Sequence, residues 1–575
     1  MAPQPAPAAP DAACAAEDFV DVPDQVERID VTVRSDADVT LQWLAPSDNA
    51  RELTHYHVFV QLWCLGQPCG PLPAQEEDSF GPTGGPLSPS AELRVVRISE
   101  VARAGSSCCS LHMPAPTFLR RSNEASSDLP SRLPSAVWVA VRACNAEGCA
   151  EWSAPMLALF RRANLAPPGA LLHTWGVSED GRLGRGEQII GQGVGAEVRE
   201  VECLRDKRFT SLSLGAHSAA VSSDDALFVW GTFMADLPSA EREEEGAVAS
   251  DIVDVLVEPA LQPTHFVPHD VSCGRFATAV LSADARVFMW GANEAHQCGI
   301  SGPRVLRSLT QLRVPYSVPI IRVAMGEMHG LALTANGTVL AWGFEQGPEV
   351  FLGAGSKINP SMCGLPERAC VHQPEPRALD ISGKVVDVAA GGYHSAAITD
   401  DGRLWTWGNN DRRQLGQGPE VPSVGEPRLL RVFPREEECQ RIVSVSLGGF
   451  HGAALDASGH VYTWGDNKRG QCGQGDTALV ETPALVRLPV PGRCVAASCG
   501  GFFTFIGAVD ASKSSSDDAS LRFYACGLGK EGCLGFGQPC KRMLRPQPIP
   551  SPQAGLHWMH VQAGVAHAAG FASQR

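Results

Sequence analysis

Histidine is the residue whose spacing in this chain most resembles a set of chemical groups. It recurs in a Gly-x-His motif, sometimes with one extra residue, that leads into small residues. The five histidines of this motif are His217, His329, His394, His451 and His567. Imidazoles bind metals, so the set could be imagined as a ring of ligands. One residue type at one place in successive copies instead indicates packing, and we predict that each histidine satisfies a backbone group within its own copy.

Cysteine is the second candidate, with 19 residues in the chain. The pairs Cys64/Cys69 and Cys144/Cys149 lack the spacing of a zinc ribbon. Other cysteines, such as Cys298, occupy repeat positions filled elsewhere by leucine or tryptophan. We expect buried thiols in a reducing compartment and no metal site. Cys144 and Cys149 flank a hairpin turn and could pair only in an oxidising compartment.

Catalytic and cofactor motifs are missing from the sequence. It contains no Gly-x-Ser-x-Gly, no His-Glu-x-x-His and no Gly-x-x-x-x-Gly-Lys-Ser/Thr. Glycine-rich pieces such as residues 191–195 are not followed by a helical pattern, so a phosphate cradle is not expected. We therefore expect no catalytic residue, no cofactor and no enzyme.

Charge points to protein partners. The formal net charge is −16, which argues against binding a phosphate backbone, and the basic pairs at 120–121 and 541–542 are short. An acidic run between Met234 and His265 is a candidate site for a basic or cytoskeletal protein, and a solvated loop is the alternative. Its candidate partner-binding residues are Glu241, Glu243, Glu244 and Glu245.

The elements that carry these residues repeat along the chain. A strand ending in Trp-Gly begins at Trp175, Trp230, Trp290, Trp342, Trp407 and Trp464, and a seventh copy, Cys526-Gly527, lacks tryptophan. The steps are 55, 60, 52, 65, 57 and 62 residues. Short strands at this period predict a seven-bladed β-propeller.

The two motifs are out of phase, which predicts how the ring closes. The first Trp-Gly has no Gly-x-His before it, and the last Gly-x-His has no Trp-Gly after it. We expect the strands of His567 and Trp175 to share one blade, so that no sheet edge stays open between the first and last blades.

Hairpin turns lie between the two motifs. Asn336-Gly337, Asp401-Gly402 and Ser458-Gly459 supply the positive φ of a tight turn. Asp225-Ala226 and Asp284-Ala285 lack this glycine, so we expect longer turns or turns of another type there.

The repeat resembles that of the regulator of chromosome condensation family. The segment 407–418 reads Trp-Gly-Asn-Asn, then Gln-Leu-Gly-Gln-Gly, and 464–475 is similar. The resemblance covers residues 168–575 and implies a seven-bladed propeller. Its founding member exchanges nucleotide on the small GTPase Ran, so the resemblance leaves exchange activity open as an alternative. The copies after Trp230 and before Cys526 depart from the pattern, the latter with a polar insert at 512–520.

The N-terminal part differs in composition. Residues 1–21 contain an Ala/Pro-rich stretch without a signal peptide or membrane span, and we expect a disordered tail. Residues 22–162 carry alternating strands, and 137–155 resembles the F strand, turn and G strand of a fibronectin type III domain. That resemblance implies a β-sandwich with Trp43 buried, Tyr56 on the C strand, and Trp138 in place of the usual tyrosine.

The combined expectation is an all-β chain that serves as a protein-interaction scaffold. We expect cytoplasmic location, within a cytoskeletal or ciliary assembly, with the nucleus as the alternative. The expected partners are proteins, such as a cytoskeletal component or a small GTPase, and neither nucleic acid nor membrane. The alternative function is guanine-nucleotide exchange on a Ran-like GTPase.

Overall fold

The computed structural model describes most of the C-terminal region and the strands of the N-terminal region. From 165 to 574 it describes all residues except 179–180, 186–193, 232–252, 255–265, 315–318, 344–374, 432–440 and 511–520. Before 165 it describes mainly strands between 25 and 159. In these described parts, no helix has the length and hydrophobicity needed to span a membrane.

Seven four-stranded antiparallel sheets form the C-terminal region, and their first strands contact one another around a ring. These innermost strands are β12 (Phe209–Leu214), β16 (Pro268–Cys273), β20 (Ile320–Met325), β24 (Val385–Ala390), β28 (Ile442–Leu447), β32 (Gly492–Cys499) and β36 (Leu556–Ala563). The second strands are β13 (Ser218–Ser222), β17 (Ala277–Ser282), β21 (His329–Thr334), β25 (His394–Thr399), β29 (His451–Asp456), β33 (Phe503–Asp510) and β37 (His567–Gln574).

The two outer layers complete each sheet. The third strands are β14 (Leu227–Trp230), β18 (Val287–Ala292), β22 (Val339–Gly343), β26 (Leu404–Gly408), β30 (Val461–Gly465), β34 (Leu521–Leu528) and β10 (Leu171–Gly176). The outermost strands are β15 (Val253–Asp254), β19 (Val305–Gln311), β23 (Arg377–Ala378), β27 (Val424–Leu429), β31 (Val480–Leu485), β35 (Arg542–Pro548) and β11 (Arg199–Glu200). The predicted seven-bladed propeller is confirmed.

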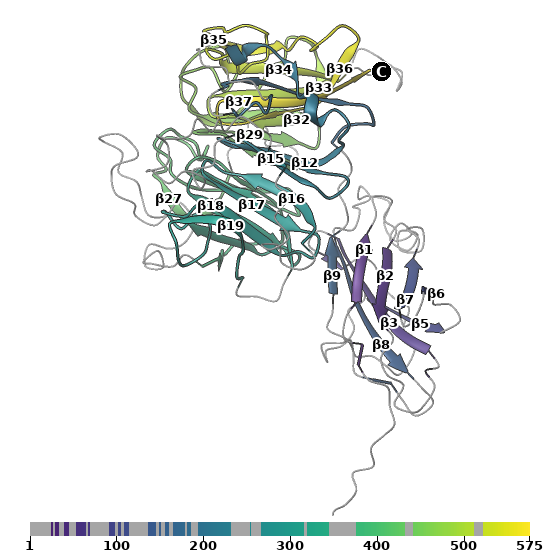
Figure 1. The fold of residues 1–575 in the computed structure, drawn as a ribbon. Coiled ribbons are helices and arrows are strands. Elements are labelled where there is room, and N and C mark those ends of the chain that lie inside the picture. Colours follow the sequence, from purple (N-terminus) through teal and green to yellow (C-terminus); the bar gives the residue numbers. More distant parts are fainter. Residues whose placement is uncertain are drawn as a thin grey trace, which may run out of the picture.

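One blade combines the two ends of the propeller. Its strand order is β11-β10-β37-β36, and Trp175 of β10 lies opposite Ala568 of β37. In Figure 1 the yellow C-terminal strands β36 and β37 lie near the top of the view, and β36 contacts β33 and β34 of the preceding blade. The pairing agrees with the closure inferred from the phase of the two motifs, and it joins residues almost 400 positions apart.

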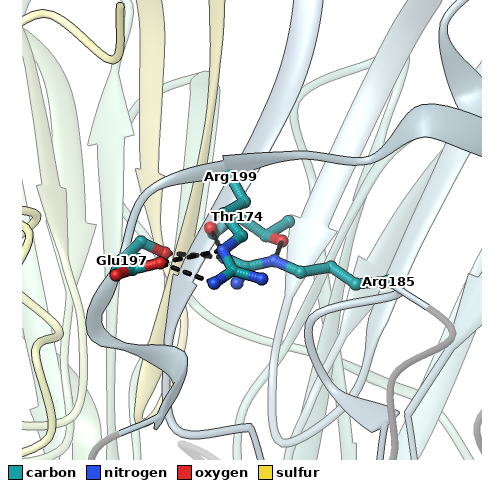
Figure 2. A network of polar contacts seen from close by, with 4 residues as sticks. All are labelled: Thr174, Arg185, Glu197 and Arg199. Carbon is teal, nitrogen blue, oxygen red and sulfur yellow. Dashed lines mark hydrogen bonds and ion pairs between the residues drawn. The ribbon is translucent and has the colours of Figure 1, made fainter.

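Arg185 links β10 to the segment before β11 in the outer part of this shared blade (Figure 2). Its guanidinium donates to the backbone carbonyls of Thr174 and Glu197, and Arg199 pairs with the Glu197 carboxylate at 2.6 Å. Gln417 and Gln474 hold the corresponding place in two other blades, where each amide donates to the threonine before the Trp-Gly. The residue between the two glycines of Leu-Gly-x-Gly therefore bonds the loop to the third strand. Two short 3₁₀ turns, η3 (Val194–Ala196) and η4 (Glu202–Leu204), lie nearby.

The hairpin turns correct one expectation. Gly337, Gly402 and Gly459 have φ of 87°, 85° and 87°, as predicted. Asp225 and Ala285 adopt the same left-handed backbone, with φ of 66° and 64°, and close turns with the same hydrogen-bond pattern. The expected longer or different turns are therefore wrong. The strand register imposes the turn geometry, and these two residues accept the strain of about 1 kcal/mol or more that glycine avoids.

Buried tryptophans lie at most of the contacts between blades. Five of the Trp-Gly tryptophans are among the largest fully buried side chains: Trp175, Trp230, Trp342, Trp407 and Trp464. Cys526 occupies the same place in the seventh blade and is also fully buried. Because neighbouring sheets share these side chains, the core is distributed around the ring.

The N-terminal region contains two further sheets, with strand orders β1-β2-β7-β6 and β4-β3-β8-β9, and β5 also pairs with β3. Their strands are β1 (Ile29–Val33), β2 (Val39–Leu44), β3 (His55–Cys64), β4 (Gln67–Pro68), β5 (Ala91–Arg97), β6 (Ala102–Ala104), β7 (Cys108–Met113), β8 (Ala136–Cys144) and β9 (Met156–Leu159). Trp43 and Tyr56 join the sheets with rings 5.2 Å apart in an edge-to-face contact. The Leu159 amide donates to Ala283 of the propeller at 2.8 Å. The domain boundaries given above stay predictions.

Candidate functional site

The seven innermost strands end together at a constriction of the central channel. Each contributes a short segment containing glycine, and the segments are 214–215, 273–275, 325–327, 390–392, 447–449, 499–501 and 563–565. Together they enclose a cavity of about 100 Å³. Half of the residues that line it are glycines.

Glycine is required here because the blades approach one another through their backbones. The amide of Gly392 donates to Gly448 of the next blade at 3.0 Å, and the amide of Val565 donates to Gly215 at 3.1 Å. A Cβ atom on Gly391 would lie 2.7 Å from the Gly448 carbonyl oxygen. A side chain at this position would therefore push two blades apart.

An apolar and largely aromatic row follows five of these seven segments along the chain. It consists of the residues directly before five successive second strands, and we call it the aromatic rim: Phe276, Met328, Tyr393, Phe450 and Phe502. Tyr393 is buried and its ring lies 5.5 Å from that of Phe450, while Met328 packs against the same pair. Phe502 is 39% exposed, so one end of the rim is open to solvent.

One ion pair interrupts the apolar character of the rim. Arg275 and Glu327, on neighbouring blades, lie 2.9 Å apart, and the Arg275 guanidinium lies 5.0 Å from the centre of the Phe276 ring. Burial raises the pKa of the Tyr393 phenol, and the charge of Glu327 and a hydrogen bond to it add to the rise. Tyr393 therefore stays protonated at neutral pH. The charged group that the rim exposes beside its aromatic rings is the Arg275 guanidinium.

The motif histidines lie behind the rim and are buried. Four of them bond through Nε2 to a hydroxyl of the next blade, in the pairs His567–Ser218, His217–Thr278, His329–Ser395 and His451–Thr504, at 2.7, 2.5, 2.8 and 2.9 Å. Burial lowers the pKa of His217, His329 and His451 to about 4, and that of His394 and His567 to about 3.

The structural role predicted for these histidines is therefore correct, but the predicted partner is wrong. The imidazoles of His217, His329, His451 and His567 bond to hydroxyls across the blade interface and not to a backbone group within one blade. Each of the four rings serves one hydroxyl, so the set is a series of blade contacts and not a ring of ligands.

The predicted acidic site lies outside the described residues. Glu241, Glu243, Glu244 and Glu245 fall in the segment 232–252, and the polar insert at 512–520 is likewise outside. The cysteines at repeat positions are described: Cys298, Cys472 and Cys526 are buried, as predicted, and burial raises the pKa of each thiol.

A second cluster, in the N-terminal sheets, was missed by the sequence analysis. His55 and His57, on β3, lie beside Cys144, at the end of β8, and beside Cys149, which forms a β-bridge with Cys144. One ligand atom from each of the four lies within 4.8 Å of the others. Cys144 and Cys149 are joined by a disulfide. The signal was the His-x-His spacing on a strand, which places both rings on one face.

Comparison with known proteins identifies the propeller. Residues 172–570 match the family described as RCC1-like domain. The chain is 28% identical over 334 residues to human E3 ubiquitin-protein ligase HERC2, but these cover 57% of the chain and only 6% of HERC2. It is 27% identical over 419 residues to the secretion-regulating guanine nucleotide exchange factor of Bos taurus, covering 70% of the chain and 83% of that protein.

Solved structures agree on the fold. Prp20p of Saccharomyces cerevisiae, described with its binding to Gsp1p and histones, superposes with a TM-score of 0.57 at 18% identity. The match covers 72% of the chain and 93% of Prp20p. Human WBSCR16 gives a TM-score of 0.55 at 20% identity, covering 70% of the chain and 99% of WBSCR16.

These relatives correct the expectation that the chain is no enzyme. Proteins that share the repeat include one named as a ligase and one named as an exchange factor. An exchange factor acts by binding and displacing, without a nucleophile or an acid–base pair of its own. The missing catalytic motifs therefore do not support a non-enzymatic assignment.

Proposed function

This chain belongs to the family of proteins with an RCC1-like domain, and we propose that its propeller binds protein partners through the aromatic rim. The observation that carries the proposal is the exposure of Phe502 at the end of a row of aromatic residues around the channel. Aromatic residues and arginine are enriched among the residues that dominate binding energy at protein interfaces. The rim presents both, on loops fixed by a rigid ring.

The partner surface has a defined chemistry. Phe502 and the partly exposed Phe450 offer ring faces, and Arg275 offers a cation whose only described ion-pair partner is Glu327. A partner with an apolar centre and an acidic group at its edge fits this arrangement.

A matched pair of substitutions tests the proposal. Phe502→Ser removes a rim side chain that is 39% exposed, and Val495→Ser removes a side chain on β32 that is 45% exposed and precedes the constriction. Proteins copurifying with the full chain are quantified for both variants. We expect a defined set to fall at least tenfold with Phe502→Ser and to remain with Val495→Ser. Recovery unchanged by Phe502→Ser contradicts the rim as the binding surface.

The second candidate function is guanine-nucleotide exchange on a Ran-like small GTPase. It is favoured by the Bos taurus relative, because that match spans 70% of the chain and most of a protein named as an exchange factor. The experiment measures release of labelled GDP from purified small GTPases in the presence of the full chain. Acceleration that Phe502→Ser abolishes supports this candidate, and no acceleration across the GTPases rejects it.

We also propose that the N-terminal sheets form a fibronectin type III-like domain. The contact between Trp43 and Tyr56 and the pairing of β3 with β8 support it. We further propose a cytoplasmic location, with the nucleus as the alternative, in which the Cys144–Cys149 disulfide is reduced. The ten described cysteines that carry free thiols support it.

A further inference from the structure

We propose that His55, His57, Cys144 and Cys149 form a zinc site in the N-terminal sheets when the two cysteines are reduced. Two thiolates and two imidazoles are a donor set that structural zinc sites use in tetrahedral geometry. The site is independent of the rim and of any function proposed for the propeller.

The strand register brings the four side chains together. His55 on β3 lies directly opposite Cys144 on β8, and His57 lies two residues along β3 on the same face. Cys149 pairs with Cys144 through an isolated antiparallel β-bridge. Ligands from three separate points of the chain therefore meet at the end of one strand pair, where backbone hydrogen bonds hold them in place.

The distances suit a single metal ion. Zinc lies about 2.3 Å from sulfur and about 2.0 Å from nitrogen, so a tetrahedral site places neighbouring sulfur and nitrogen atoms about 3.6 Å apart. The Cys149 sulfur lies 3.9 Å from Nδ1 of His57, and one ligand atom from each of the four residues lies within 4.8 Å of the others. After reduction, the two sulfur atoms must separate from bonding distance for all four ligand atoms to reach one metal ion. The part-buried environment also limits competition from water.

Arg142 adds a positive charge next to the four ligand residues. Its Nε donates to Nδ1 of His57 at 3.0 Å, so the lone pair of this nitrogen is directed at the guanidinium while the cysteines form the disulfide. Zinc can bind at Nδ1 only when the guanidinium moves off this nitrogen, and the two thiolates can then accept its hydrogen bonds. Two thiolates balance the charge of Zn²⁺, so the site with Arg142 carries one net positive charge.

Zinc binding and the disulfide exclude each other. Binding converts two thiols to zinc-bound thiolates and releases two protons. Starting from the disulfide, a thiol or phosphine reductant must first supply two electrons while two protons are taken up. The sulfur–sulfur bond and the zinc site are thus alternative states of one cysteine pair.

The test measures metal in the full chain purified with a phosphine reductant. After dialysis against zinc and then against buffer, we expect about one zinc per chain, and Co²⁺ should give the visible bands of a tetrahedral thiolate site. Cys149→Ser should lose the metal, whereas Cys203→Ser, at an exposed thiol of the propeller, should keep it. Wild-type protein without zinc, or Cys149→Ser with undiminished zinc, overturns the proposal.

A measurement on wild-type protein covers the case in which Cys149→Ser does not fold. Zinc should protect Cys144 and Cys149 from alkylation, as mapped by mass spectrometry, and a chelator should restore their reactivity. Cys203 serves as the internal control because its reactivity should not change. Equal alkylation of Cys144 and Cys149 with and without zinc overturns the proposal.

Discussion

In four of the five blades with a motif histidine, the residue that faces it from the next blade is a serine or threonine, whereas His394 faces Gly452. Where histidine bonds across an interface, the next blade supplies serine or threonine. Where the position holds Phe503 or Ala277 instead, the corresponding residue of the next blade is Ala568 or Gly330, which has no hydroxyl. The pairing follows from burial, since an imidazole without an acceptor or donor loses its hydrogen bonds to water without replacement.

A double-variant experiment measures this pairing. Ser395→Ala should lower the free energy of unfolding by about 1–3 kcal/mol, because Nε2 of His329 stays buried without its hydroxyl partner. His329→Phe/Ser395→Ala copies the pair Phe503 and Ala568. Its cost in chemical denaturation should be smaller than the sum of the two single costs. Strict additivity would contradict the pairing.

The buried histidines also make stability depend on pH. Their pKa falls from the usual value near 6.5 to about 4 or about 3 in the folded chain, because burial penalises the imidazolium. Between these values the unfolded chain binds more protons, so stability is full above about pH 6.5 and falls as the pH drops toward 4. His394→Phe should reduce the slope of the unfolding free energy against pH by the amount that about one bound proton contributes. A slope equal to that of the wild type between pH 4 and 6 would refute the assignment.

Among the elements, the third strand offers an alternative contact between blades. Trp342, Trp464 and Trp175 donate their indole N–H to a carbonyl in the loop of the preceding blade, at 2.9, 2.8 and 2.9 Å. The second-strand residues opposite them are Gly330, Gly452 and Ala568, the small residues that lack a hydroxyl. At these three interfaces the tryptophan indole therefore supplies a hydrogen bond between blades, whereas at the other four a histidine bonds to a hydroxyl.

The space taken by tryptophan predicts a non-additive substitution. Gly452→Thr would offer a hydroxyl to His394, but its Cβ would lie 2.6 Å from the Trp464 ring, so it should destabilise by about 1–3 kcal/mol or more. Adding Trp464→Cys reproduces the combination of Thr504 and Cys526. We expect Gly452→Thr to cost less in the Trp464→Cys background than in the wild type, as measured by thermal unfolding. An equal cost in both backgrounds would contradict the steric explanation.

The sequence predicted the elements well and the site poorly, for one physical reason. A repeated motif indicates the features that all blades have in common. The Trp-Gly strands, the glycine turns and the shared blade could therefore be predicted. The left-handed Ala285 could not, because strand register and not local preference decides its backbone. The rim residues vary between copies, from Phe276 to Met328 to Tyr393, so no repeated pattern indicates them. The cluster of His55 with Cys149 requires a tertiary return of the chain that spacing does not contain.

At the scale of the whole molecule, the ring is closed because the first and last strands of the propeller lie in one sheet. β37 lies between β10 and β36, so the chain of hydrogen bonds in this blade passes through the last strand. Leu171, at the start of β10, pairs with Ala572, near the end of β37. The ends of these antiparallel strands are therefore adjacent, and we expect that the chain of the propeller can be opened at another connection instead.

Two rearrangements of the propeller test this closure. Deleting residues 567–575 removes β37 and leaves β10 and β36 without their shared partner, so we expect loss of cooperative unfolding and self-association through the exposed strand edges. A circular permutant of the propeller should instead fold as a monomer. It joins Gln574 to Leu171 through a short glycine linker and begins at Val490, in the connection between β31 and β32. Calorimetry and light scattering distinguish the outcomes. A monomeric, cooperative deletion variant would show that the shared blade is dispensable, and an unfolded permutant would show that the ring depends on its natural break.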